Sequence, residues 1–169
     1  MTPRRRATTS RPESRKKPTP TVATIGYELA TVPSLIGALR KGRVAVLVDM
    51  RAVASSRRPG FSKSALAASL EDAGIHYVHL RGLGTPADGR AAARSGRYAD
   101  LRRIFSAHLK TLAARDDLMS LTELVQSGRR TCLLCLEASP EHCHRSMVAS
   151  ALGDLIPIKL NRLSAFPPT

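Results

Sequence analysis

The chain has 169 residues, of which 43% are hydrophobic and 4% aromatic, with no tryptophan. This composition predicts one globular domain with a core of aliphatic side chains. No apolar run approaches the ~18 residues of a membrane-spanning helix, and no apolar segment follows the basic N-terminus, so we expect neither a membrane span nor a secretion signal. Three cysteines within residues 132–143 do not suit a disulfide framework, and we expect a reducing, cytoplasmic location.

The net charge of +14 favours an acidic partner, such as nucleic acid or an anionic small molecule. Residues 1–20 hold seven basic residues against one acid, a net charge of +6, together with four prolines. They predict a disordered basic tail, which either solubilises the protein or contacts nucleic acid loosely through phosphates. No helix-turn-helix, zinc-finger or base-stacking motif indicates sequence-specific recognition.

The first half of the domain alternates strands and helices. Residues 21–26 are β-branched and apolar and predict a strand. Residues 31–42 predict a helix, with Thr31 as its cap and Gly42 as its stop. A buried strand over 43–50 follows, then a helix over 62–74 and a strand over 75–80.

The second half continues the pattern after a loop predicted over 81–90 from its glycines and proline. Helical periodicity covers 98–113 and 117–128, and an apolar strand follows over 129–137. A helix over 139–153 has Ser139 as its expected cap, and the last strand is placed at 156–160.

This alternation predicts an α/β fold: a single three-layer domain over 21–169, with a mostly parallel sheet and helices on both faces. Ligands of such sheets bind at the carboxyl ends of the strands. The reactive and polar residues of this chain gather there, so we expect a site built from Tyr27, Asp49, Arg51, Cys135, Glu137, Cys143, His144 and Arg145.

The segment 135–145, "CLEASPEHCHR", carries the chemistry of this site. Cys135 and Glu137 lie two apart and share one face of a strand. A start of the helix at Ser139 places Cys143 near positive helix-end charge, which favours the thiolate. We therefore assign catalysis to Cys135, Glu137, Cys143 and His144, with Glu137 handling protons. The alternative is that the cysteines pack the core and that Glu137 and Arg145 form a structural ion pair.

Zinc is a further alternative, because Cys132, Cys135, Cys143 and a histidine supply enough ligands for a tetrahedral site. Residues three apart on a strand face opposite sides, however, so we expect Cys132 to be a core residue.

The loop after the second strand, "DMRAVASSRRPGF", is basic. Asp49 suits the orientation of an arginine, and Arg51 and Arg57 suit the binding of a phosphate or carboxylate. We expect Arg58 to be solvated. The predicted substrate-binding set is Tyr27, Asp49, Arg51, Arg57 and Arg145.

The motifs "TIGY", "LVDMRAVASSRRPGF", "GIHYVHLRGLG" and "CLEASPEHCHR", in this order, resemble the DUF488 family of small, mainly prokaryotic proteins of unknown function. The resemblance covers residues 21–160. Met50, Ala54 and the loose match of "RGLGTP" depart from the pattern, and Cys132 lies outside it. The resemblance implies a compact α/β fold with one shared site and implies no reaction.

Three hypotheses follow from the sequence. The first is an enzyme acting on an anionic, nucleotide-like or nucleic-acid substrate bound through Arg51, Arg145 and helix amides. The second is a module that binds nucleic acid or a nucleotide without chemistry. The third is a metal protein whose ligands are Cys135, Cys143 and either His144 or Glu137.

Overall fold

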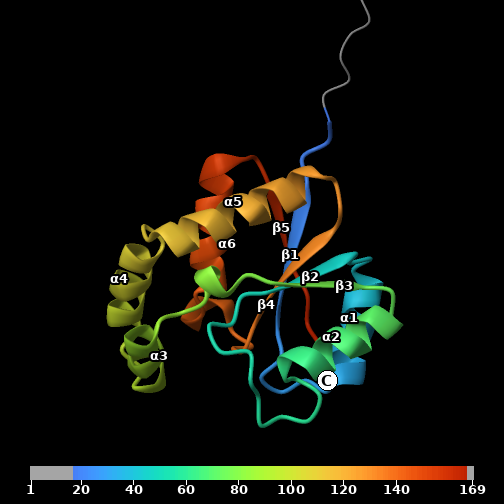
Figure 1. Ribbon diagram of the computed structural model, residues 1–169, viewed down its shortest axis with the longest axis horizontal. Helices are drawn as coiled ribbons and strands as arrows, with labels where there is room; N and C mark the ends of the chain where they lie inside the picture. Colours follow the sequence, from blue (N-terminus) through green and yellow to red (C-terminus); the bar gives the residue numbers. More distant parts are fainter. Residues whose placement is uncertain (1–16, 167–169) are drawn as a thin grey trace, which may run out of the picture.

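A computed structural model describes residues 17–166 and shows a five-stranded, all-parallel sheet (Figure 1). The strand order is β3-β2-β4-β1-β5. The strands are β1 (Thr21–Gly26), β2 (Val46–Asp49), β3 (His76–His79), β4 (Thr131–Cys135) and β5 (Lys159–Arg162). The predicted α/β class with a parallel sheet is therefore confirmed.

Six α-helices and two short 3-10 helices connect the described strands. The α-helices are α1 (Val32–Lys41), α2 (Lys63–Asp72), α3 (Ala87–Arg94), α4 (Tyr98–His108), α5 (Leu112–Gln126) and α6 (Arg145–Leu155). The 3-10 helices are η1 (Arg81–Leu83) and η2 (Pro140–His142). Helix α1 begins as its sequence predicts, because Thr31 and Ser34 form a capping box.

Two hydrophobic clusters form the core. Alternate strand residues such as Ile25 and Leu134 pack with leucines of α1 and α2, whereas Val48 and Leu133 pack with apolar residues of α4, α5 and α6. Successive residues of a strand point to opposite faces, so the two clusters lie on different sides of the sheet. Figure 1 shows α1 and α2 together, well away from α5 and α6.

Several sequence-based boundaries are wrong. The helices predicted over 98–113 and 117–128 are divided elsewhere, because α4 ends at His108 and Thr111 caps α5, which begins at Leu112. The segment 81–90, predicted as a loop, contains η1 and the start of α3 after Pro86. The segment 139–153, predicted as one helix, is interrupted: η2 ends at His142, Cys143 has extended backbone, and α6 begins at Arg145. The last strand lies at 159–162, because β5 pairs with β1 only from Lys159 onward.

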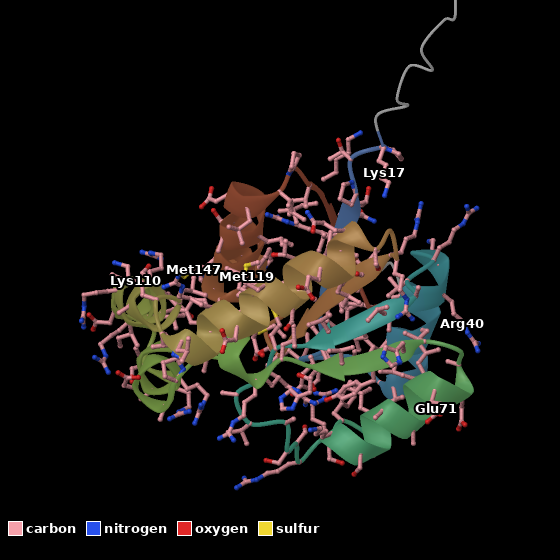
Figure 2. All side chains as sticks on the ribbon, turned by 45° about the horizontal axis from the view of Figure 1, so that its top comes forward. Lys17, Arg40, Glu71, Lys110, Met119 and Met147 are labelled. Carbon is pink, nitrogen blue, oxygen red and sulfur yellow. The ribbon has the colours of Figure 1, made fainter. Side chains whose placement is uncertain are left out.

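Residues 1–16 of the predicted tail lie outside the described residues. Residues 17–20 form no helix or strand, and the carbonyl of Pro20 accepts a hydrogen bond from the Lys159 amide at 2.9 Å. Basic side chains such as Lys17, Arg40 and Lys110 are exposed in separate parts of the chain (Figure 2). Within residues 17–166, no helix combines the length and the apolar character that crossing a membrane would demand.

Candidate active site

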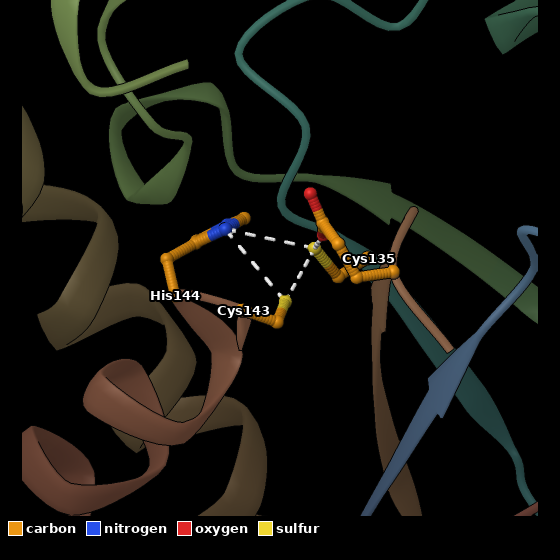
Figure 3. Close-up of side chains that lie close together, drawn as sticks. Cys135, Cys143 and His144 are labelled. Carbon is orange, nitrogen blue, oxygen red and sulfur yellow. Dashed lines mark hydrogen bonds between the residues drawn. The ribbon is translucent and has the colours of Figure 1, made fainter. Parts of the chain in front are cut away.

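Four side chains converge at the carboxyl end of β4 and are called the cysteine cluster below: Cys135, Glu137, Cys143 and His144. Cys135 is the last residue of β4, and Cys143 and His144 lie between η2 and α6. One sulfur, nitrogen or oxygen atom from each residue lies within 4.8 Å of the others. The sequence prediction that these residues meet at the sheet edge agrees with this geometry (Figure 3).

Gly26 positions the segment that carries Glu137. It pairs with Cys135 in the β1–β4 register, and a Cβ at residue 26 would lie 2.0 Å from the carbonyl oxygen of Glu137. Beyond it, the amide of Glu28 donates to the carbonyl of Leu136 at 2.8 Å. The chain after β4 therefore lies directly against the end of β1, and only glycine permits this approach.

The two sulfurs of the cluster are in close contact. Cys143 Sγ lies 2.7 Å from Cys135 Sγ, which in turn lies 2.8 Å from Glu137 Oε2. Nδ1 of His144 faces both sulfurs, at 3.5 Å from Cys135 and 3.9 Å from Cys143. All three cysteines of the chain are free thiols.

The break between η2 and α6 has a local cause. The amide of Arg145, the first residue of α6, donates to Cys143 Sγ at 3.4 Å. This contact and the short sulfur–sulfur distance hold Cys143 outside the helix. The expectation that Cys143 lies in the first turn of a helix is therefore wrong, although its sulfur still receives one helix-end amide.

Burial dominates the protonation of the cluster. It raises the pKa of Cys135 well above the ordinary thiol value, and the hydrogen bond between the Cys135 and Cys143 sulfurs raises it further. Burial alone would lower the pKa of His144, but the neighbouring Cys135 and Glu137 outweigh it and raise that pKa. Burial therefore favours the neutral thiol of Cys135, and the expectation of a thiolate there stays a prediction.

Arg145 is a buried cation, with 3% of its surface exposed. Its Nη2 donates to the carbonyl of Ala138 at 2.8 Å, but Nε and Nη1 have no hydrogen-bond partner among the described residues. Within residues 17–166, no ion pair joins it to Glu137. Two buried donors on a charged group without partners are energetically unfavourable and point to a missing negative charge nearby.

His144 extends from the sulfurs to a cavity. Its ring is buried, and Nε2 has no hydrogen-bond partner in the part of the chain that the structure describes. The cavity has a volume of about 320 Å³ and is also lined by Glu137, by Arg90 and Arg94 of α3, and by Tyr98 of α4. A half-buried carboxylate and an unpartnered imidazole nitrogen thus face one accessible space.

A second polar group, the aspartate network, lies around the end of β2. It contains Asp49, Arg51, Tyr27 from just after β1 and Tyr77 from within β3. The Arg51 guanidinium binds both carboxylate oxygens of Asp49, at 2.6 Å from Nη2 to Oδ2. Nη1 donates to the Tyr27 hydroxyl at 3.0 Å and to the Phe61 carbonyl at 2.7 Å, and Tyr77 donates to Asp49 at 2.6 Å. The predicted orientation of Arg51 by Asp49 is thus observed, and these contacts favour a structural role.

The electrostatics of the aspartate network follow from these contacts. Burial on its own would raise the pKa of Asp49, but the hydrogen bonds and charge of Arg51, with a hydrogen bond from Tyr77, hold that pKa below its usual value. Burial and the Asp49 carboxylate raise the pKa of Tyr77. The group is a charged pair with a neutral phenol at physiological pH.

The remaining arginines of the basic loop differ from each other. Arg57 is exposed, and its assignment to substrate binding stays a prediction. Arg58, expected in solvent, is half-buried and donates to the carbonyls of Glu28 and Ala30, because the loop folds back against the chain after β1.

Cys132 is fully buried in the cluster that packs on α1 and α2. It belongs to the opposite face of β4 from Cys135 and is not among the converging donors. Burial raises its pKa far above the ordinary value. The prediction that Cys132 is a core residue is confirmed.

The sequence interpretation did not assign Arg90, Arg94 or Tyr98 to the site, because it placed a loop over 81–90 and no helix over 91–97. Signals for a helix were present. Proline is common at helix starts, and Pro86 is followed by three consecutive alanines, 91–93, which favour helix. Gly89 within the segment obscured them, since glycine disfavours helix.

The family model of "Domain of unknown function DUF488" matches residues 31–152. The chain therefore belongs to the DUF488 family, as its motifs suggested. The matched span includes the whole cysteine cluster and the strands β2, β3 and β4. No curated protein and no solved structure matches the chain.

Proposed function

We propose that this protein is an enzyme whose cysteine cluster binds a zinc-type transition metal and acts on an anionic substrate. Cys135, Cys143 and His144 are the ligands, and Glu137 is the proton carrier. The observation that carries the proposal is the convergence of two thiols, one imidazole and one carboxylate within 4.8 Å. Such mixed sulfur and nitrogen donor sets are typical of zinc.

The distances support a metal in part. With Zn–S of about 2.3 Å and Zn–N of about 2.0 Å, a tetrahedral site separates sulfur from nitrogen by about 3.5 Å and two sulfurs by about 3.8 Å. The sulfur–nitrogen distances of 3.5 and 3.9 Å agree with this. The sulfur–sulfur distance of 2.7 Å must open by about 1 Å, which a rotation of the Cys143 side chain would provide.

Charge balance also supports the metal-bound state of the cysteine cluster. A metal ion removes the thiol protons, so Cys135, Cys143 and Glu137 together carry three negative charges. A divalent metal offsets two of them, and the buried Arg145 offsets the third. The bound state thus supplies the negative charge that the Arg145 guanidinium lacks.

Three ligands leave one coordination position for catalysis. A metal there would polarise the substrate or a water molecule. Glu137, half-buried and facing the cavity, would accept and return the proton. The net charge of +14 and the arginines of α3 favour an anionic substrate, and the free thiols favour a reducing, cytoplasmic location.

A second function is favoured by one observation. The 2.7 Å contact between Cys135 and Cys143 is also close to the ~2.05 Å bond of a disulfide, so the pair suits thiol–disulfide exchange with a partner disulfide. In that case the two thiols lose two electrons and two protons to the partner disulfide, which becomes two thiols.

The test is elemental analysis of the full-length, reduced protein after growth with added zinc. We expect about one metal ion per chain in the wild type and less than a tenth of that in Cys135→Ser and Cys143→Ser. Cys132→Ala is the matched control and should keep its metal, because Cys132 lies on the other face of β4. Circular dichroism confirms that each variant is folded.

A wild-type protein that binds no zinc, with a Cys135–Cys143 disulfide formed on mild oxidation, would replace the metal proposal with the redox function. Mass spectrometry detects that disulfide as the loss of two hydrogens. Neither metal nor disulfide would leave both proposals without support.

A further inference from the structure

We infer that the 320 Å³ cavity beside the cysteine cluster binds a small molecule that carries a phosphate-like anion and a planar ring, as a nucleotide does. Arg90 and Arg94 hold the anion, and the ring lies against Tyr98 and His142. This inference names the substrate class of the proposed function and rests on it.

The cavity joins elements that are distant in the sequence. Helices α3 and α4 supply one wall, and the segment from Leu136 to His144 supplies the other. Its volume lies at the small end of the range for ligand sites, about 300–1,000 Å³. It suits one small molecule and not an extended polymer.

Arg90 is oriented for anion binding. It is half-buried, and Nη1 donates to the carbonyl of the buried Thr85 at 2.8 Å. This is its only side-chain hydrogen bond within residues 17–166, so the other donors of its guanidinium face no protein acceptor. Arg94 lies one helical turn further along α3 and lines the same cavity. Two guanidinium groups at this spacing match the oxygens of a phosphate.

A buried polar group independently points to a ligand. Within residues 17–166, Nε2 of His144 has no hydrogen bond of normal distance and angle, although the side chain is only 6% exposed and the backbone of Met50 lies close to the ring. The same residue lines the cavity and contacts the sulfurs with Nδ1. A ligand atom at Nε2 would satisfy the nitrogen and lie next to Glu137, and so at the reactive end of the cavity.

Between these ends the cavity is lined by aromatic and aliphatic side chains. Tyr98 and His142 stack with ring centroids 4.1 Å apart and an interplanar angle of 7°. Leu101 and Leu136 complete this side. Glu28 also lines the cavity, but one of its carboxylate oxygens accepts the amide of Ala138 at 3.1 Å. An anion therefore binds at the arginine end, and a planar ring suits the stacked pair.

The experiment is calorimetric titration of the full-length protein with inorganic phosphate and with AMP, at physiological ionic strength. We expect AMP to bind more tightly than phosphate, and the double variant Arg90→Ala/Arg94→Ala to weaken AMP binding by about 10- to 100-fold, as the loss of charged hydrogen bonds predicts. The matched control is Arg102→Ala/Arg103→Ala on α4, which removes the same charge from exposed positions. It should change the affinity by less than about threefold.

Equal weakening in both double variants would show non-specific attraction to a basic protein and would overturn the inference. So would a wild type that binds neither probe, or one that binds AMP no more tightly than phosphate. Metal content is measured in the same samples. A protein without metal whose AMP binding depends on Arg90 and Arg94 refutes the proposed metal function alone, and a metal-loaded protein indifferent to these arginines refutes only the present inference.

Discussion

The aspartate network and the cysteine cluster lie at the same edge of the sheet and differ in how completely their polar atoms are paired. Arg51 is 6% exposed and directs Nε, Nη1 and Nη2 at protein acceptors. Arg145 is 3% exposed, yet Nε and Nη1 have no partner among the described residues, and neither has Nε2 of His144. Both regions contain a buried arginine and a carboxylate, so residue types alone do not separate them.

The difference in hydrogen-bond pairing distinguishes a group suited to a structural role from one suited to binding a ligand. A paired buried charge stabilises the fold and leaves nothing for a ligand, whereas an unpaired buried donor has a cost that binding can remove. The family motifs contain both groups. We therefore propose that Asp49 and Arg51 stabilise the fold, and that the chemistry of the proposed function belongs to the cysteine cluster with Arg145.

The largest expected effect comes from a substitution that breaks the aspartate network. Asp49→Asn leaves the Arg51 charge buried without its counter-ion and should lower the free energy of unfolding by about 3–5 kcal/mol. Urea unfolding measures this change. The control is Asp100→Asn, which breaks exposed pairs with Arg97 and Arg103 and should cost less than about 1 kcal/mol. A loss below 1 kcal/mol for Asp49→Asn would mean that the network is not structural.

The same pair predicts a pH dependence. Since the pKa of Asp49 is lowered in the folded protein, the unfolded chain binds a proton first on acidification. The contribution of this group is fully present above the unfolded-state value of about 3.9 and is lost as pH falls through the lower folded-state pKa. Unfolding free energies measured between pH 7 and 3 should fall more steeply for the wild type than for Asp49→Asn. Parallel curves would contradict the lowered pKa.

The second-largest expected effect is the loss of thermal stability when metal is removed from the cysteine cluster. A metal ion that binds only the folded protein, at a free concentration of 100 times its Kd, stabilises the fold by about 2.7 kcal/mol. Removal of the metal by a chelator should therefore lower Tm by about 5–10 °C. Scanning calorimetry before and after chelation measures the shift. Cys143→Ser should show no shift on chelation, because it lacks a ligand. An equal shift in this variant would place the metal elsewhere.

The third prediction tests whether the close approach of the Glu137 backbone to Gly26 is required for the cysteine cluster. Gly26→Ala places a methyl group against the Glu137 carbonyl and should destabilise by about 1–3 kcal/mol while reducing the metal content. Gly37→Ala is the matched control, because the new methyl group meets nothing within 4 Å and the residue lies within α1. It should stabilise by about 0.5–1 kcal/mol. Normal metal content in Gly26→Ala would show that the Glu137 segment can move without loss of the site.

Much of the fold was predictable because its signals are local. The apolar runs at β2 and β4, the cap at Thr31 and the alternation of elements all act within a few residues, and they led to the correct class. The meeting of Cys135, Glu137, Cys143 and His144 followed from one topological rule, that parallel strands bring their carboxyl ends to one edge.

What failed depends on side-chain contacts that the helix-start and loop signals do not contain. "SPEH" has the sequence of a helix start, but the contact of Cys143 with Cys135 and the Arg145 amide delays the helix. Arg58 finds its acceptors at Glu28 and Ala30, about thirty residues earlier in the chain. No local pattern contains such information, so neither the saturation of Arg51 nor the isolation of Arg145 was visible in the sequence.

The smallest expected effect comes from a single hydrogen bond of the aspartate network. Tyr77→Phe removes the 2.6 Å bond to Asp49 Oδ2 but leaves that oxygen bonded to Arg51, so the loss should be only about 1 kcal/mol. A double-mutant cycle with Asp49→Asn isolates the coupling between the two residues. In a saturated network this coupling is favourable, and metal content is unchanged because Tyr77 contacts no member of the cysteine cluster through a hydrogen bond within residues 17–166. If Tyr77→Phe instead reduced metal binding, the two groups would form one connected site, and the division between a structural and a chemical region would have to be abandoned.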